Sequence, residues 1–165
     1  MIRRAVLGLG SNVGGRAMLR AATDRCRHLP DTVLLRCSSI YCGAPWGGAA
    51  GGRFFNAALL VDTGLPPWEL LAATRRVERA LGRRRGPRFA PRSIDIDLLW
   101  FEGARLELPT LQLPHPRLCE RRFALLPLVE VAPGAVLAPG VRATAALAAC
   151  RDRGALWRCE RPPSV

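Results

Sequence analysis

The chain has 165 residues, a length that fits one domain able to bury a substantial core. Apolar residues make up 49% of it and charged residues 23%, proportions that exclude disorder as the main state. Its 25 basic residues, all arginine, and 13 acidic residues give a formal net charge of +12. Such a surface should attract polyanions, namely nucleotides, nucleic acid or anionic membranes.

Neither a membrane span nor a signal peptide is expected. No apolar run reaches the ~18 residues of a transmembrane helix, and the apolar stretch 5–9 is too short for a signal-peptide core. We therefore expect a cytoplasmic protein. Six cysteines lack zinc-site spacing, so we expect reduced, mostly buried thiols.

Hydrophobic periodicity and Gly/Pro punctuation predict the elements in chain order. Strands are expected at 4–9, 32–41, 54–62 and 93–101, with helices at 16–29 and 66–81. The glycine- and proline-rich stretches 43–53 and 83–92 are expected to be loops. An extended stretch at 110–116, a helix at 120–131 kinked or interrupted by Pro127, a short helix at 143–150 and a strand at 155–158 follow.

The order β-α-β-β-α-β does not alternate strictly, which argues against a parallel α/β sheet. It favours an α+β fold with a ferredoxin-like βαββαβ core, whose antiparallel-rich sheet packs two helices on one face and is followed by C-terminal additions. We expect a single domain over residues 1–165.

Two carboxylates stand out in the strand at 93–101. Because strand side chains alternate, Asp95 and Asp97 share one face, about 7 Å apart, while Ile94, Ile96 and Leu98 point into the core. Paired, partly buried carboxylates need a compensating cation. Magnesium is usually held by one or two carboxylates plus substrate phosphates. The alternative is a pair of solvated aspartates on an exposed edge strand.

Arginine is dense just before this pair. Eight arginines and a single acid, Glu78, lie between positions 75 and 92. Arginine beside a carboxylate pair suggests polyphosphate binding. The candidates in or beside the loop are Arg83, Arg85, Arg88 and Arg92, whereas those at 75, 76 and 79 read as a solvated helix face. The chain has no lysine, which excludes a Walker-type phosphate loop.

Other polar and aromatic residues sit in unusual places. His115 lies between two prolines and close to Arg121, which makes it a candidate phosphate contact. Asn56 interrupts an apolar strand, so either the backbone or a flat heterocycle must satisfy its amide. Three phenylalanines near these positions are candidates for ring stacking, although each alone would fit a plain core: Phe54, Phe89 and Phe123.

Together these residues resemble the 6-hydroxymethyl-7,8-dihydropterin pyrophosphokinase family of the folate pathway, from residue 9 to about residue 140. The motifs that carry the resemblance are Leu9-Gly10-Ser11-Asn12, Phe55-Asn56-Ala57-Ala58, Glu78 with Gly82-Arg83, Pro91-Arg92-Ser93-Ile94-Asp95-Ile96-Asp97, and Pro114-His115-Pro116 with Arg121 and Phe123. The resemblance implies an ATP-dependent enzyme that transfers pyrophosphate to the hydroxymethyl group of the dihydropterin and releases AMP.

The resemblance also implies roles for individual residues. Asp95 and Asp97 would ligate two Mg²⁺ ions and, with Arg83 and Arg92, form the catalytic set. The ATP-binding set would be Glu78, Arg83, Arg85, Arg88, Arg92, Leu98, His115 and Arg121. The pterin-binding set would be Gly43, Ala44, Trp46, Phe54, Asn56 and Phe123. The loops 43–53 and 83–92 resemble lids, and we expect a monomer that acts on two small molecules, without a membrane or a specific nucleic acid as partner.

The resemblance has departures, and other functions stay open. Phe89 and Ala90 stand where many members have Trp and Gly, and the loop 83–92 is about one residue shorter than expected. The alternatives are a basic RNA-binding module on a ferredoxin-like sheet and a non-catalytic paralogue. The stacking segment typical of RNA-recognition sheets is absent, and the complete aspartate pair argues against a paralogue without activity.

Overall fold

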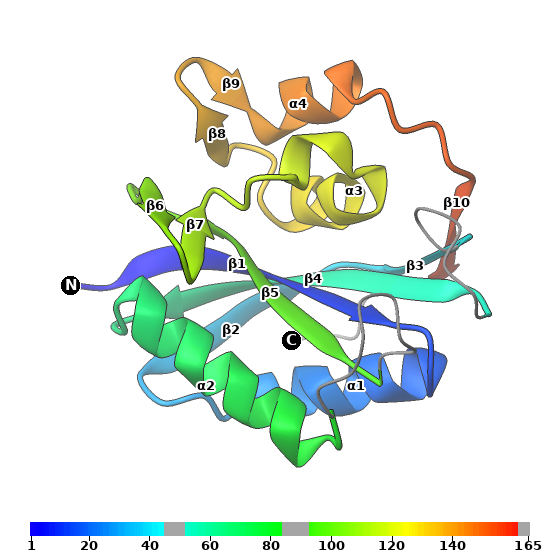
Figure 1. Cartoon of the computed structure of the whole chain (residues 1–165), viewed down its shortest axis with the longest axis horizontal. Coiled ribbons are helices and arrows are strands. Elements are labelled where there is room, and N and C mark those ends of the chain that lie inside the picture. The colour runs from blue at the N-terminus through cyan, green and yellow to red at the C-terminus, as the bar shows by residue number, and fades with distance from the viewer. Residues whose placement is uncertain (45–51, 84–92, 162–165) are drawn as a thin grey trace.

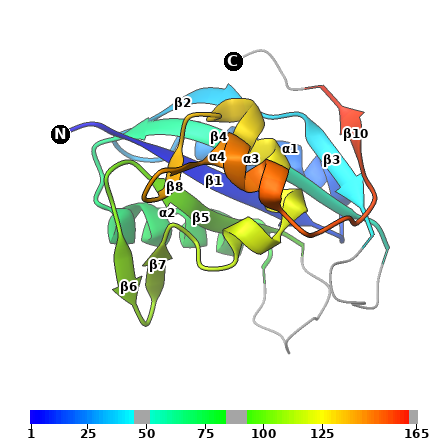
Figure 2. The ribbon, with the colours of Figure 1, turned by 90° about the horizontal axis from the view of Figure 1, so that it is seen from above.

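Three layers make up the fold in the computed structural model, which describes residues 1–44, 52–83 and 93–161. A six-stranded sheet forms the middle layer. Helices α1 (Gly15–Cys26) and α2 (Pro67–Ala80) cover one face of it, and α3 (Arg122–Val131) and α4 (Ala143–Ala149) lie on the other (Figures 1 and 2).

The strand order confirms the ferredoxin-like prediction. The sheet runs β10-β3-β4-β1-β5, β2 also pairs with β4, and every pair is antiparallel. The strands are β1 (Arg3–Ser11), β2 (Thr32–Cys37), β3 (Ile40–Gly43), β4 (Phe54–Thr63), β5 (Asp95–Phe101) and β10 (Leu156–Glu160). Outside the sheet are the ribbons β6 (Leu106–Leu108) with β7 (Leu111–Leu113) and β8 (Val136–Ala138) with β9 (Val141–Arg142), and a 3₁₀ turn, η2 (Leu118–Glu120).

The predicted strand 32–41 is in fact two strands, because Ser38 and Ser39 interrupt it. The Ser38 N–H donates to the carbonyl of Ala58 (2.8 Å), and the Ser38 hydroxyl accepts the Ala58 N–H (2.8 Å). The side chain thus takes over part of the sheet's hydrogen bonding, which lets the chain bend between β2 and β3.

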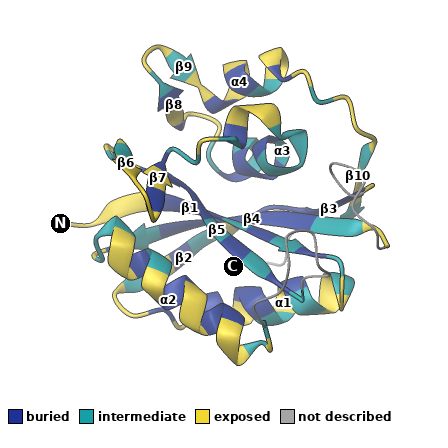
Figure 3. Cartoon of the chain, in the orientation of Figure 1, coloured by how far each residue is buried: buried dark blue, intermediate teal, exposed yellow. Residues whose placement is uncertain are grey.

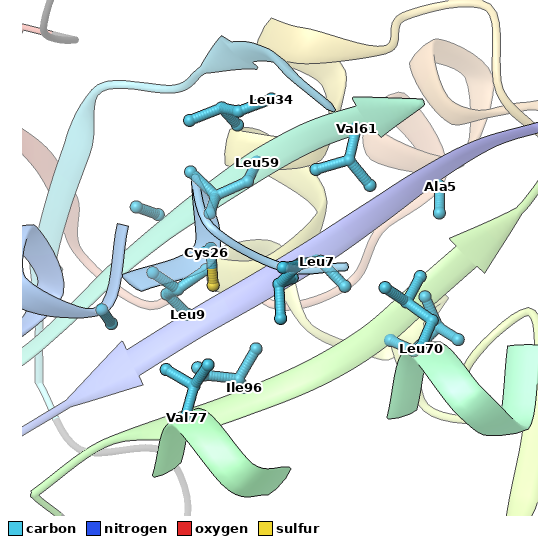
Figure 4. Packing of buried hydrophobic residues seen from close by; sticks show 14 of the residues in the cluster. Ala5, Leu7, Leu9, Cys26, Leu34, Leu59, Val61, Leu70, Val77 and Ile96 are labelled. Atoms are coloured by element: carbon cyan, nitrogen blue, oxygen red, sulfur yellow. The ribbon is translucent and has the colours of Figure 1, made fainter. Parts of the chain in front are cut away.

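Each face of the sheet buries its own apolar core, which explains the nearly continuous apolar runs of the central strands. Leu59 and Val61 of β4 pack under α1 and α2, as Figure 4 shows, whereas Ala58 and Leu60 pack under α3 and α4. The dark central strands in Figure 3 reflect this burial from both sides. In the described part of the chain, no helix is long and apolar enough to cross a membrane.

A β-bulge in β5 decides which way its residues face. The register with β1 shifts between Val6 and Leu7, so that Leu99 and Trp100 both join the core under α3. Before the bulge, Ile94, Ile96 and Leu98 join the core under α1 and α2, as predicted. Asp95 and Asp97 therefore face the α3 side.

The segments after β5 differ most from expectation. The extended stretch predicted at 110–116 contains β7, but its partner β6 and the β8–β9 ribbon were not predicted, since strands of two or three residues carry too little periodicity to recognise. Helix α3 runs through Pro127 to Val131, so of the two predicted effects of this proline an interruption does not occur, and Pro127 is buried. The short helix and the last strand, predicted at 143–150 and 155–158, are α4 and β10.

Candidate functional site

One cross-strand row gathers the distinctive polar side chains on the α3 face of the sheet. Asp95 of β5 pairs with Gly10 of β1, Gly10 pairs with Asn56 of β4, and Asn56 pairs with Tyr41 of β3. Directly paired residues of an antiparallel sheet project to the same side. Asp97 projects to that side as well, one row further along β5. The side chains of Asp95, Asp97 and Asn56 therefore lie on one surface of the sheet, which we call the floor of the site.

Of the two glycines on that floor, Gly10 leaves room above it, whereas Leu99 fills the place above Gly8. A Cβ atom on Gly10 would lie 3.4 Å from Asn56 Oδ1 and 3.5 Å from Phe54 Cε1. Gly8, which pairs with Asp97, has Leu99 Cδ1 only 2.7 Å from the corresponding point. The space over Gly10 is thus bounded by a hydrogen-bonding amide and the edge of an aromatic ring, the two features that a flat heterocycle requires.

The strand carrying the carboxylates is fixed at its start by Ser11. The buried Ser11 hydroxyl lies 2.5 Å from the carbonyl of Ser93 and 2.8 Å from that of Val13, and donates to these acceptors. This contact joins the end of β1 to the start of β5. The Asp95–Gly10 pairing follows directly after it.

Asp97 is strongly perturbed. Burial raises the pKa of its carboxyl to about 7, and the nearby carboxylates Asp95 and Glu78 add to the rise, against Arg121 and Arg83. Of the described residues, none forms an ion pair with Asp97 within 4.0 Å. A cation brought to this point would relieve both the desolvation and the repulsion.

Arg83 reaches the carboxylates from the end of α2. Gly82, at φ 81°, ends the helix in a Schellman motif, in which the N–H of Arg83 donates to the carbonyl of Glu78 (3.0 Å). The Arg83 guanidinium then donates to Glu78 Oε1 and to Asp95 Oδ1, the latter at 2.6 Å. Arg83 was predicted to contact phosphate, and in this structure its side chain is hydrogen-bonded to two carboxylates.

Glu78 links this helix to the edge of the sheet. Its Oε1 atom accepts the main-chain N–H of Ile96 at 2.7 Å, on the outer side of edge strand β5. Burial raises the pKa of Glu78, while the bond from Ile96 and the charge of Arg83 lower it. Glu78 therefore anchors the strand that bears both aspartates.

Residues that precede η2 and α3 in the chain face the carboxylates from the other side. The N–H of His115 donates to the carbonyl of Leu99 (2.9 Å). Burial lowers the pKa of the His115 imidazole, and the charge of Arg121 lowers it further, so the ring is neutral at pH 7. Arg121 precedes α3, and its Cζ atom lies 5.8 Å from the centroid of the Phe123 ring. Burial lowers the pKa of Arg121, and the negative charges of Asp97 and Asp95 raise it by a smaller amount.

A contact that sequence reasoning missed holds α3 to the sheet. The Glu130 carboxylate accepts hydrogen bonds from Ser39 N (3.0 Å), Ser39 Oγ (2.8 Å) and Tyr41 Oη (2.9 Å). Tyr41 belongs to the same row as Asn56. The only signal in the sequence was the polar Ser-Ser-Ile-Tyr stretch inside an apolar strand, which gave no hint of its partner.

The structure gathers most of the predicted residues at one end of the sheet. Phe54 and Asn56 project from β4, Gly43 pairs with Phe54, and Ala44 follows Gly43. The side chain of Leu98 is the exception, because it is 3% exposed and points into the core under α1 and α2, away from the carboxylates. Four predicted residues lie outside the described part: Trp46, Arg85, Arg88 and Arg92, as do Phe89, Ala90 and most of both predicted lids.

The donor set suits a metal that arrives with a substrate. Among the described residues there is no cluster of three or more His, Cys, Asp or Glu side chains able to hold a metal ion. Two carboxylates on one face, one with its pKa raised to about 7, instead match magnesium shared with phosphate oxygens. Asp95 and Asp97 therefore fit such an ion.

Comparison with known proteins gives one consistent result. A family model described as 7,8-dihydro-6-hydroxymethylpterin-pyrophosphokinase (HPPK) matches residues 6–133. A 2-amino-4-hydroxy-6-hydroxymethyldihydropteridine pyrophosphokinase of Methylorubrum extorquens is 44% identical over 135 residues, covering 81% of this chain and 85% of that protein. The Pseudomonas aeruginosa protein of the same name is 39% identical over 155 residues, covering 93% and 96%.

Solved structures agree on the fold. The crystal structure of wild-type Plasmodium falciparum HPPK-DHPS with pteroate superposes with a TM-score of 0.72 at 13% identity. The match covers 90% of this chain and 42% of that one, so this chain spans less than half of the Plasmodium protein.

Proposed function

Because this chain belongs to the 7,8-dihydro-6-hydroxymethylpterin-pyrophosphokinase family, we propose that the floor around Asp95, Asp97 and Asn56 is its active site. The enzyme transfers a pyrophosphate group to the hydroxymethyl group of 6-hydroxymethyl-7,8-dihydropterin, a step of folate biosynthesis. The observation that supports this placement is the row Asp95–Gly10–Asn56, which sets a carboxylate pair and an amide two strands apart on one open face.

The dihydropterin lies over Gly10 in this proposal. Asn56 bonds the edge of the pterin ring, and Phe54 from the sheet and Phe123 from α3 flank the ring. Half-buried positions for both phenylalanines support this role, because each ring is held by the protein yet keeps an accessible surface. Gly43 and Ala44 border the same end, and the resemblance adds Trp46, which lies outside the described residues, to the pterin-binding set.

ATP occupies the carboxylate end. The substrate hydroxyl oxygen attacks the β-phosphorus and gives up its proton to solvent, the bond from that phosphorus to the α,β-bridging oxygen breaks, and AMP leaves with that oxygen. The protein has little covalent work to do, so positioning and charge neutralisation dominate. His115 and Arg121 contact the phosphates, with Arg83 and Glu78 beside the nucleotide. Arg85, Arg88 and Arg92 complete the set from outside the described residues.

Two Mg²⁺ ions are proposed to be held by Asp95 and Asp97 together with phosphate oxygens. Bound there, the metal would act as a Lewis acid and a clamp on the triphosphate. Arg83 has a second role in this picture, because it shields Asp95 until the metal arrives and stays attached to Glu78. Residues 1–165 work as one domain, as a cytoplasmic monomer with two small-molecule substrates.

Product analysis tests the proposal. Full-length protein with ATP, magnesium and hydroxymethyl-dihydropterin should release AMP, and Asp97→Asn should lose most of that turnover while remaining folded. Asp24→Asn is the matched control, since this aspartate is exposed on α1 (78% of its side chain). Release of ADP, or full activity in Asp97→Asn, would contradict the proposal. Nucleic-acid affinity falling steeply with salt would favour the RNA-binding alternative.

A further inference from the structure

The last strand of the chain lies against the pterin end of the proposed site. Strand β10 pairs with β3, with Leu156 opposite Gly43 and Arg158 opposite Tyr41. Gly43 is thereby enclosed, with Phe54 of β4 on one side and Leu156 on the other. A Cβ atom on Gly43 would lie 2.8 Å from the carbonyl oxygen of Ala155, so β10 packs directly on this residue.

A second contact reaches the other flank of the same region. The Arg53 guanidinium carbon lies 5.3 Å from the centroid of the Trp157 ring, a cation–π contact. Arg53 directly precedes Phe54, the first residue of β4. Strand β10 therefore holds Gly43 at the end of β3 and Arg53 at the start of β4, on both sides of the proposed stacking residue.

The strand is itself secured to the body of the protein. Glu160 accepts two hydrogen bonds from Arg20 of α1, at 3.0 and 2.7 Å, and Arg16 lies 4.0 Å away. A bidentate arginine–carboxylate pair fixes orientation as well as distance. Figure 1 shows β10 reaching this edge after a long connection from α4, so its position depends on such contacts.

We propose that β10 is a positioning element for pterin binding: through Trp157 and Leu156 it fixes Arg53 and Gly43, and with them the setting of Phe54. This inference rests on the proposed function, because it assumes that Phe54 stacks on the pterin. No part of β10 contacts a substrate in this proposal. Removing the contacts that β10 makes should weaken pterin binding and should not change ATP binding.

A double-mutant cycle in the full-length protein tests the link. Trp157→Ala and Arg53→Gln should each raise the KM for hydroxymethyl-dihydropterin about 2- to 5-fold, the range of an exposed cation–π contact. The double variant should be no worse than either single one, because both remove the same contact. The KM for ATP should not change. Trp68→Ala is the matched control, since this tryptophan is 58% exposed on α2, against 43% for Trp157.

The outcomes separate clearly. An unchanged pterin KM, an equal rise in both KM values, or effects that multiply in the double variant would each overturn the inference. Arg53 is exposed and outside the strands, so Arg53→Gln decides the matter even where Trp157→Ala unfolds. Failure of the proposed function itself is distinguishable, because wild-type protein would then release no AMP before any variant is compared.

Discussion

Asp95 and Asn56 lie two strands apart in one cross-strand row, with only the backbone of Gly10 between them. The reacting end and the recognition end of the proposed site are thus fixed by the register of three adjacent strands. Their separation is set by backbone hydrogen bonds and not by flexible side chains.

Substituting Gly10 by alanine should impair substrate binding without harming the fold. The added methyl group would lie 3.4 Å from Asn56 Oδ1 and 3.5 Å from Phe54, contacts that the strand tolerates. The methyl group would occupy the space proposed for the pterin, so we expect the KM for the pterin to rise about tenfold, or ~1.4 kcal/mol. Thermal stability should stay the same or rise slightly, since alanine suits a strand better than glycine.

Gly134→Ala provides the comparison for that variant, because a Cβ atom there meets nothing within 4 Å. Steady-state kinetics on both variants measure the KM for the pterin, and thermal melts measure their stability. A Gly10→Ala enzyme with wild-type pterin KM would show that the substrate lies elsewhere.

The pKa of Asp97 predicts an unusual pH dependence. Folding raises it from 3.8 to about 7, so between these values the folded carboxyl keeps a proton that the unfolded chain has released. The stability contributed by this group therefore falls as pH rises through that window, and the deficit is complete above about pH 7. Asp97→Asn should melt at least about 3 °C above wild type at pH 8 and near wild type at pH 4.

Melting curves at several pH values, with Asp24→Asn as control, show whether the difference in melting temperature increases as the pH rises. A difference that grows as the pH falls would contradict the assigned cause. Adding magnesium with a non-hydrolysable ATP analogue at pH 8 should raise the melting temperature of wild type and not of Asp97→Asn, because the proposed metal site needs both carboxylates.

Substituting Glu78 should first of all lower the free energy of unfolding, because this carboxylate anchors β5. Alanine at this position leaves the Ile96 N–H without its acceptor and the Arg83 guanidinium with Asp95 alone, so we expect a loss of about 3 kcal/mol in the free energy of unfolding. Glutamine keeps an acceptor for Ile96 and should cost roughly half of that. Urea unfolding measures both, beside Glu69→Ala in the exposed first turn of the same helix. Equal stabilities for the alanine and control variants would exclude the anchoring role.

The sequence predicted those parts of the site that depend on local period. Alternation along one strand was enough to place Asp95 and Asp97 on the same face, and it also assigned Leu98 to the core. The resemblance also put Leu98 among the nucleotide contacts, and because its side chain is buried in the core, that role stays a prediction about its main chain. Asn56 was recognisable because an amide is unexpected in an apolar strand.

Long-range partners could not be predicted in this way. Nothing near position 39 indicates that its hydroxyl and N–H bond a carboxylate 91 residues later. Likewise, the strand predicted at 155–158 gave no indication of its partner, since the pairing of β10 with β3 is not recorded in the local sequence of β10. Strand register and strand pairing depend on the whole fold. The space over Gly10, between Asp95 and Asn56, can therefore be recognised only in the structure.

Glu130 provides the sharpest test of such a long-range contact. Its carboxylate accepts three hydrogen bonds from Ser39 and Tyr41, so Glu130→Ala leaves three donors unsatisfied between α3 and the sheet. We expect a loss of about 2–4 kcal/mol in urea unfolding. Because the same helix carries Phe123, the pterin KM should rise as well. Glu120→Ala, whose side chain is 64% exposed in η2, should change neither quantity. Loss of stability with an unchanged pterin KM would mean that α3 is held over the substrate by other contacts.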